Sequence, residues 1–445
     1  MLAGLLRFVR LDQPGQVIFD ETYYARDACR YIGNTAKECG APEPSMIQFT
    51  HGGTLERLQN LEQSYVHPPL GKWLIAIGIK LFGFNPFGWR FSAAAFGTAL
   101  VAVVFAITRI LFRRRLTAAL AGMLVATDFL LLVQSRVALL DIFLAFFVAL
   151  GFLFMVKDRE HVLHLLEPGD PLGREPRRRW VRIAAGVAFG AAIAVKWSGV
   201  LALAGAGLLA VGWSASLGLR RAGLPKEGPR PPSLTSELAF TFLALVAVPV
   251  GVYMASYAVW FAEHQWSFVH FVELHKRVLG FHETLRARHS YQSSAWSWPL
   301  VQRPVLYHYQ GPPTYPQSSN VSAIGNIATW YAALVAGVWM LGRSARAWRP
   351  ERVVLAGWLS QFLPWLLIQR TLFFFYMTPV VPFMMIGLAA GLTRMSDAGR
   401  LERWLVGTFV ALGVGVMLWF FYPYLTAVDM SPELWRSHHW FPTWL

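Results

Sequence analysis

The chain has 445 residues, of which 55% are hydrophobic and only 15% are charged, and its formal net charge is +15. Soluble proteins carry about 25% charged residues, so this composition excludes an ordinary soluble domain and indicates an α-helical protein that crosses a membrane several times. The positive charge gathers in short loops between apolar runs, which is typical of cytoplasmic loops and argues against a nucleic-acid partner.

The chain begins with a short apolar stretch. Residues 1–11 are too short to cross a bilayer, and no small-residue cleavage site of a signal peptide follows them. We interpret the stretch as the second half of a truncated first transmembrane helix. A mis-assigned start codon would explain the truncation, and so would a naturally short or half-inserted helix.

A long polar loop follows at residues 12–68. It contains an adjacent pair of acids, Asp20 and Glu21, and the two cysteines of the chain, Cys29 and Cys39. Charged pairs at a membrane edge are expensive to place, which makes this loop a candidate site.

Ten further apolar runs predict transmembrane helices. Residues 71–84 precede them and are short enough to indicate a helix lying in the membrane interface. The predicted spans lie near residues 90–112, 116–133, 138–156, 182–196, 198–215, 237–260, 323–342, 353–369, 371–393 and 404–422. With the truncated first helix, the sequence predicts an all-α polytopic membrane protein with about eleven spans.

A Pro-rich segment at residues 223–233 divides the chain. It predicts a cytoplasmic linker between an N-terminal half, residues 1–222, and a C-terminal half, residues 234–445. The C-terminal half is expected to contain an outward loop at residues 261–322 and to end in a four-span region.

Arginine-rich loops assign the two sides of the membrane. Loops with an excess of Lys and Arg face the cytoplasm, and they alternate with the loop that holds Asp20 and Glu21. These acids therefore face outward. Cys29 and Cys39 lie in the same outward loop. An oxidising compartment favours a disulfide between them, and two free thiols are the alternative.

The acidic pair allows two interpretations. Acids stabilise the start of a helix, and residues 23–31 could be helical. Alternatively, one carboxylate acts as a general base on a hydroxyl nucleophile while its neighbour orients a substrate or holds a cation. Asp20 and Glu21 are adjacent, so their side chains point in different directions on a helix.

Three cations lie at the outward ends of predicted spans. Arg136 could pair with Asp141, and Lys196 and Arg370 could be interfacial anchors. Together the three could instead bind a phosphate and stabilise it as a leaving group.

Aromatic and histidine side chains fill the remaining outward segments. His67 precedes two prolines that make a rigid helix entry, where it could be no more than polar lining. Tyr291, Trp296 and Trp298, followed by Arg303, could form an interfacial belt, or could stack on a sugar or cradle an extended peptide.

These motifs in this order resemble the protein O-mannosyltransferase family nearly from end to end. The matching segments are residues 19–21, 67–72, 136–141, 196–199 and 291–307. The short loop at residues 261–322 is similar to that of the bacterial members, because the eukaryotic members carry a folded β-trefoil domain there.

The resemblance implies a membrane glycosyltransferase of the GT-C type that moves mannose from polyprenyl-phosphate mannose to Ser or Thr of secreted or membrane proteins, with inversion, on the outer face of a bacterial plasma membrane. It implies that Asp20 is the base, that Glu21 positions a substrate, and that the donor phosphate binds Arg136, Lys196 and Arg370. The residues it implies for the acceptor side are His67, Asp141, Tyr291, Trp296, Trp298 and Arg303. It demands no cofactor, and it does not decide whether a divalent metal is used.

Two other functions compete with this one. A GT-C enzyme with a lipid or cell-wall glycan as acceptor could share the carboxylate and the phosphate site. A polyprenyl-lipid transporter would place charges at the membrane midplane in paired repeats, whereas the charges here gather at the outward edge. The segment at residues 291–307 favours a protein acceptor.

Overall fold

The computed structural model describes residues 1–35, 37–40, 66–164, 180–222, 233–285, 288–345 and 349–444. Most of the polar loop after Gly40 and all of the predicted linker except Ser233 lie outside this part of the chain.

Each predicted span coincides with one or more helices, which confirms the helical membrane architecture. They are α4 (Pro86–Phe112), α5 (Arg115–Thr127), α6 (Phe129–Gln134), α7 (Asp141–His164), α8 (Trp180–Val195), α9 (Gly199–Ala222), α10 (Leu234–Phe242), α11 (Val248–Ser256), α12 (Ala258–Glu263), α14 (Ile327–Ser344), α15 (Glu351–Phe362), α16 (Val381–Ser396), α17 (Arg400–Phe409) and α18 (Met417–Leu425). The predicted interfacial helix is α3 (Leu70–Phe82).

Within the described residues, four helices are long and apolar enough to cross a membrane: Pro86–Phe112, Gly199–Ser216, Leu234–Ser256 and Arg400–Leu425. Three shorter apolar helices are Arg115–Thr127, Trp180–Val195 and Val381–Ser396. Two of the long ones continue through π-helical turns, at Leu243–Ala247 and Val410–Val416.

The hairpin between α3 and α4 shows how local sequence sets this packing. Asn85 caps α4 by accepting a hydrogen bond from the backbone N–H of Gly88, and Pro86 follows at a position that needs no donor. A Cβ on Gly88 would lie 2.1 Å from the carbonyl oxygen of Gly83, so only glycine permits this close approach.

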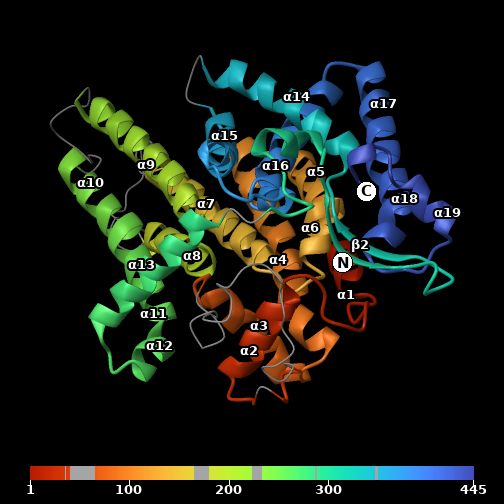
Figure 1. The fold of residues 1–445 in the computed structure, drawn as a ribbon. Helices are drawn as coiled ribbons and strands as arrows, with labels where there is room; N and C mark the ends of the chain where they lie inside the picture. The colour runs from red at the N-terminus through yellow and green to blue at the C-terminus, as the bar shows by residue number, and fades with distance from the viewer. Residues whose placement is uncertain are drawn as a thin grey trace.

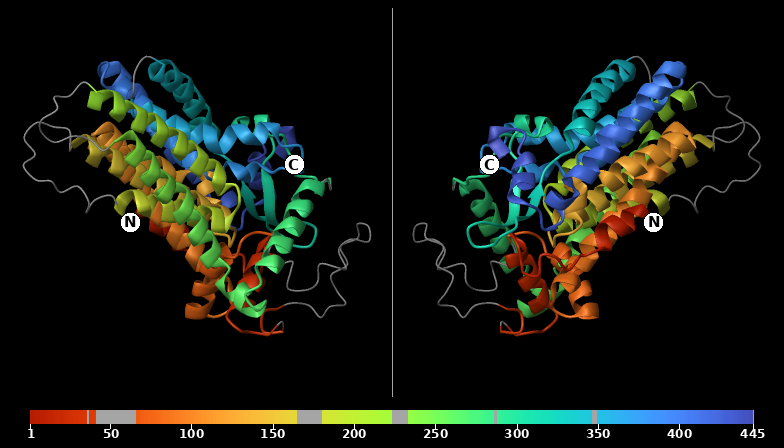
Figure 2. Two further views of the ribbon diagram at one scale, coloured as in Figure 1. Left: turned by 90° about the vertical axis from the view of Figure 1, so that its left-hand side faces the viewer. Right: turned by 90° about the vertical axis from the view of Figure 1, so that its right-hand side faces the viewer.

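The long helices run side by side, and shorter elements gather at one end of the bundle (Figures 1 and 2). These are α2 (Glu21–Tyr31), α13 (Phe268–Thr284) and an antiparallel ribbon of β1 (Val305–Gln310) and β2 (Ser319–Ala323), in which Val305 pairs with Ala323. From the sequence, residues 261–322 were expected to form a loop, and neither α13 nor the ribbon was predicted.

Helix α13 is held by a small aromatic cluster of its own. Phe271, Leu274 and Val278 repeat at helical spacing and pack on Tyr257 and Trp260. One face of α13 is therefore fixed against α11 and α12. The adjoining face, which includes Leu279 and His282, lines cavities.

Candidate active site

A cavity of about 450 Å³ is lined in part by α13. Its wall is largely apolar, and its charged and polar lining comes from distant parts of the chain. That lining includes His67, Asp141, Lys196, His282, Gln361, Gln369, Arg370 and Tyr376. A concave apolar site with a few convergent polar groups is the usual form of a small-molecule site.

Lys196 and Asp141 form a buried ion pair on this wall. The Nζ atom of Lys196 lies 2.9 Å from each carboxylate oxygen of Asp141. Asp141 begins α7 and Lys196 directly follows α8, so each charge complements the dipole of its helix end. The ammonium has three N–H donors, and the pair uses two of them, which leaves one for a ligand.

Arg370 is fixed by two neighbours and keeps one donor unused. Its Nη1 lies 2.7 Å from Nδ1 of His282, and its Nη2 donates to the hydroxyl of Tyr376 at 3.0 Å. Its buried Nε has no partner among the described residues. An unpaired guanidinium N–H on a residue that lines the cavity together with Lys196 suits an anionic ligand.

His282 connects Arg370 to the backbone just before His67. Its Nε2 lies 3.1 Å from the carbonyl oxygen of Val66. A carbonyl can only accept, so Nε2 carries the proton and Nδ1 accepts from Arg370. Burial lowers the pKa of His282, and the charge of Arg370 lowers it further, which keeps the ring neutral in this role.

Asp20 occupies the N-cap position of α2, yet its side chain makes no capping hydrogen bond. Burial raises its pKa to about 6, while the nearby charge of Lys196 opposes the shift and that of Asp141 adds to it. Part of Asp20 remains exposed. An uncommitted carboxyl with this pKa is mostly ionised at neutral pH and accepts a proton more readily than an ordinary aspartate.

The chain bends sharply just before this carboxylate. Phe19 has a φ of 48°, in the left-handed region that non-glycine residues seldom adopt. Its ring stacks on Tyr307 with 4.4 Å between centroids and meets Phe375 edge-on at 5.8 Å. This packing offsets the cost of the backbone conformation and fixes where Asp20 emerges.

Glu21 lies in a different environment from its neighbour. Its carboxylate accepts from Nε and Nη2 of Arg90 at 2.7 and 2.8 Å, and both side chains are 0% exposed. The backbone N–H groups of Ile18 and Ala138 donate to the same carboxylate. This geometry corrects the expected contact between Glu21 and a substrate, because no surface of the side chain is left for one. We place Glu21 as a residue that positions Asp20.

Replacing Glu21 with glutamine is expected to lower the free energy of unfolding by about 3–5 kcal/mol, because it leaves the guanidinium of Arg90 buried without its counter-charge. Thermal and denaturant unfolding of the detergent-purified protein would measure the loss. The exposed Glu263→Gln is the matched control, expected to change stability by less than about 0.5 kcal/mol. An unchanged melting temperature for Glu21→Gln would contradict this role.

Arg136 does not line the cavity, and its expected role in phosphate binding is corrected by its hydrogen bonds. It does not pair with Asp141 either. Its guanidinium donates instead to the backbone carbonyls of Leu6, Arg7, Val9 and Arg10. These carbonyls lie at and after the end of α1 (Leu2–Phe8), where helix carbonyls lack internal partners and attract a cation.

Two links hold α2 in place. A disulfide joins Cys29 in α2 to Cys39. Lys72 in α3, which is almost fully buried, forms an ion pair with Asp27 at 3.1 Å. Both links restrain the helix that starts directly after Asp20.

A second cavity, of about 590 Å³, adjoins the first. Trp296 lies on its rim and is 61% exposed, and its polar lining includes Gln292, Ser293 and Ser294. The two cavities share one wall, formed by Trp365, Ile368, Gln369 and Arg370. A ligand in the second cavity would therefore reach Arg370 from the other side.

The remaining residues predicted for the acceptor side build the loop rather than line a cavity. Trp298 is 1% exposed and its indole N–H donates to Ser293. Arg303 lies over the ring of Tyr291 and donates to the carbonyls of Ser290 and Thr443. Trp298 is therefore packed inside the loop, whereas Tyr291 and Arg303 are partly exposed and their contact with a substrate stays a prediction.

Polar residues of the cavity that were missed in the sequence include His282, Gln361, Gln369 and Tyr376. Gln361 lies inside a predicted span, and a polar side chain in such a run is itself a signal of function. His282 lies in a segment that was expected to be a loop, so the sequence did not predict its contact with Arg370. Among the described residues, no three His, Cys, Asp or Glu side chains are grouped so that they could hold a metal ion.

The helical membrane bundle has the fold of membrane glycosyltransferases of the GT-C type. Solved structures agree on the fold. The S. cerevisiae protein O-mannosyltransferase Pmt1–Pmt2 complex bound to the sugar donor matches with a TM-score of 0.76 and 15% identity, over 100% of this chain and 91% of that chain. ArnT from Cupriavidus metallidurans bound to undecaprenyl phosphate matches with a TM-score of 0.57 and 19% identity, over 92% and 61%.

Sequence comparison identifies the family. The dolichyl-phosphate-mannose–protein mannosyltransferase family matches residues 1–267, and the C-terminal four-transmembrane region of protein O-mannosyltransferases matches residues 267–444. The polyprenol-phosphate-mannose–protein mannosyltransferases of Mycolicibacterium smegmatis and Mycobacterium tuberculosis are each 32% identical over 100% of this chain, and the chain covers 91% and 90% of them. The chain belongs to the protein O-mannosyltransferase family and is a glycosyltransferase, which confirms the resemblance.

Proposed function

We propose that the protein transfers mannose from polyprenyl-phosphate mannose to Ser and Thr hydroxyls of secreted or membrane proteins, on the extracytoplasmic face of a bacterial plasma membrane. The observation that carries the proposal is the position of Asp20, a carboxylate without a hydrogen-bond partner among the described residues, close to a cavity that presents Lys196 and Arg370. The donor and acceptor named for the mycobacterial relatives fit this geometry.

The reaction is a single displacement. The acceptor hydroxyl oxygen forms a bond to the anomeric carbon of mannose while the bond from that carbon to the phosphate oxygen breaks. Asp20 takes the hydroxyl proton, and polyprenyl phosphate leaves with the bonding electron pair. Attack opposite the leaving group inverts the anomeric carbon, from a β-linked donor to an α-linked product.

Arg370 and Lys196 stabilise the leaving phosphate as negative charge develops on it. The unused Nε of Arg370 and the third N–H of Lys196 supply hydrogen-bond donors at a cavity with a largely apolar wall. Preorganised donors of this kind are worth more in such a site than in bulk water.

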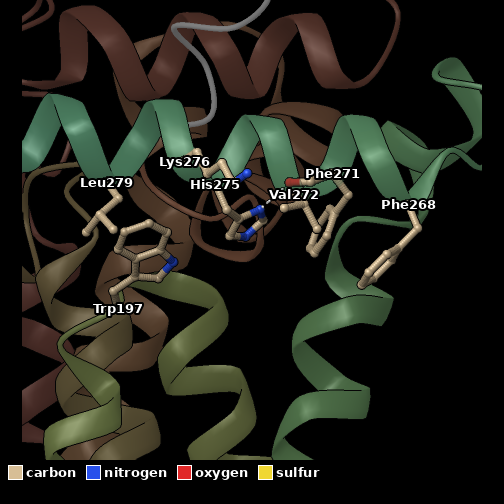
Figure 3. A pocket seen from close by; sticks show the side chains of 7 residues that line it. All are labelled: Trp197, Phe268, Phe271, Val272, His275, Lys276 and Leu279. Carbon is tan, nitrogen blue, oxygen red and sulfur yellow. Dashed lines mark hydrogen bonds between the residues drawn. The ribbon is translucent and has the colours of Figure 1, made fainter.

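An apolar groove continues from the cavity and suits the polyprenyl chain of the donor. It holds about 300 Å³ between α13 and Trp197, and Trp197 and Leu279 line both spaces. Figure 3 shows Phe268, Val272 and Leu279 along one side of α13, facing the space beside Trp197. Apolar chains bind such surfaces through burial, without directional contacts.

The second cavity is proposed to hold the acceptor peptide. It opens at the wall that contains Arg370, its rim carries the exposed Trp296, and its polar lining suits an extended Ser- or Thr-rich chain.

A transfer assay with purified membranes tests the proposal. Radiolabelled polyprenyl-phosphate mannose is supplied with a Ser/Thr-rich peptide, and label is expected in the peptide. Trp296→Ala is expected to raise KM for the peptide roughly tenfold without changing KM for the donor, because it removes one large contact surface. Label that appears only in lipid or glycan would assign the enzyme another acceptor class, and no transfer to any acceptor would overturn the proposal.

A further inference from the structure

We propose that Gln361 binds a hydroxyl group of the donor sugar and so helps to select the sugar that is transferred. The inference rests on the proposed function, because it takes the cavity of about 450 Å³ as the site of the donor head group.

Gln361 is a buried amide with an unused donor. It lies one residue before the end of α15, is 1% exposed and lines the cavity. Its Nε2 has no hydrogen-bond partner among the described residues. A buried N–H group that is left unpaired costs free energy in the ligand-free protein, and a ligand that accepts a hydrogen bond there would remove this cost.

The hydrogen-bond donors of the cavity differ in charge, and this difference separates their roles. Arg370 and Lys196 carry the positive charge that a phosphate requires. Gln361 is neutral, and an amide matches an uncharged hydroxyl, which both donates and accepts. A site built to hydrogen-bond a hydroxyl discriminates strongly against a ligand that lacks it, since its own polar group is then left unpaired.

Ser360, the preceding residue, provides a matched control. Its hydroxyl is also buried and without a partner among the described residues, but it does not line the cavity. It lies instead beside Gly205 of α9. The two residues thus share a helix and an unpaired polar atom, and they differ in that Gln361 lines the cavity whereas Ser360 does not.

Kinetics of purified Gln361→Met and Ser360→Ala enzymes, with saturating acceptor peptide, test the inference. Gln361→Met is expected to raise KM for polyprenyl-phosphate mannose about tenfold, as the loss of one hydrogen bond predicts, and to leave Ki for sugar-free polyprenyl phosphate unchanged. The melting temperature of the ligand-free variant should stay equal or rise, because an unpaired polar group has been removed. Ser360→Ala should leave both KM and Ki unchanged.

Deoxymannose donors add a test that does not depend on folding. The deoxy analogue that lacks the contacted hydroxyl should have the same KM with the wild-type and Gln361→Met enzymes. With the other deoxy analogues, the difference in KM between the two enzymes should remain. An unchanged KM, or an equal rise in KM and in Ki for polyprenyl phosphate, would overturn the inference. These outcomes differ from failure of the proposed function, in which the wild-type enzyme itself would transfer no mannose from this donor.

Discussion

Replacing Asp20 with asparagine is expected to lower kcat for mannose transfer by about 10²- to 10⁴-fold, the range that general-base catalysis contributes. The amide keeps the shape of the side chain but cannot take the proton of the acceptor hydroxyl. In the wild type, the carboxylate of Asp20 has no hydrogen-bond partner among the described residues, so the substitution should leave the fold intact. The measurement is initial transfer rate at saturating donor and peptide, beside the melting temperature of the same preparation.

The pH dependence provides an independent check on this base. Because the pKa of Asp20 is raised to about 6, kcat/KM in the wild type should be constant above that pH and fall about tenfold per unit below it, as the carboxylate becomes protonated. The residual activity of Asp20→Asn should lack this acidic limb. The exposed Asp12→Asn, in the same loop, should keep both the rate and the limb, and the persistence of the limb in Asp20→Asn would contradict the assignment.

Replacing Arg370 with methionine should lower kcat/KM by about 10²- to 10³-fold, because it removes a fixed cation from the leaving phosphate. Arg370→Lys should recover part of the rate, since the charge returns without the planar guanidinium that holds His282 and Tyr376 together. Single-turnover rates with bound donor would isolate the chemical step. The exposed Arg403→Met is the control.

His282 variants show whether the orientation of Arg370 matters. In His282→Asn the side-chain oxygen can replace Nδ1 and accept from Arg370, whereas in His282→Gln the amide nitrogen can replace Nε2 and donate to Val66. His282→Asn should therefore retain more activity, and the difference should vanish in the Arg370→Met background. An equal loss in both variants would show that Arg370 does not depend on this bond.

The sequence predicted most of the architecture, because long apolar runs specify helices wherever they occur. It also predicted five residues that the fold brings near one another, namely Asp20, His67, Asp141, Lys196 and Arg370. It could not separate Asp20 from Glu21, because the difference arises from Arg90, which reaches the pair only in three dimensions. The sequence also could not reveal the partners of Arg136, because they are backbone carbonyls, which every residue type provides.

The elements missed in the sequence lack strong local signals. Helix α13 carries charged residues among its apolar ones, and its packed face becomes recognisable only beside Tyr257 and Trp260. The ribbon of β1 and β2 is short and contains an irregularity between Leu306 and His308. Its stability comes from the surrounding structure rather than from an alternating pattern of its own.

The wall shared by the two cavities has a thermodynamic consequence. A ligand in either cavity contacts the same Gln369 and Arg370, so the binding of one ligand changes the surroundings of the other. The affinities of lipid donor and protein acceptor are then linked, and linkage requires the effect to be equal in both directions. In an enzyme built in this way, the affinity for the activated sugar depends on whether a polypeptide is present to receive it.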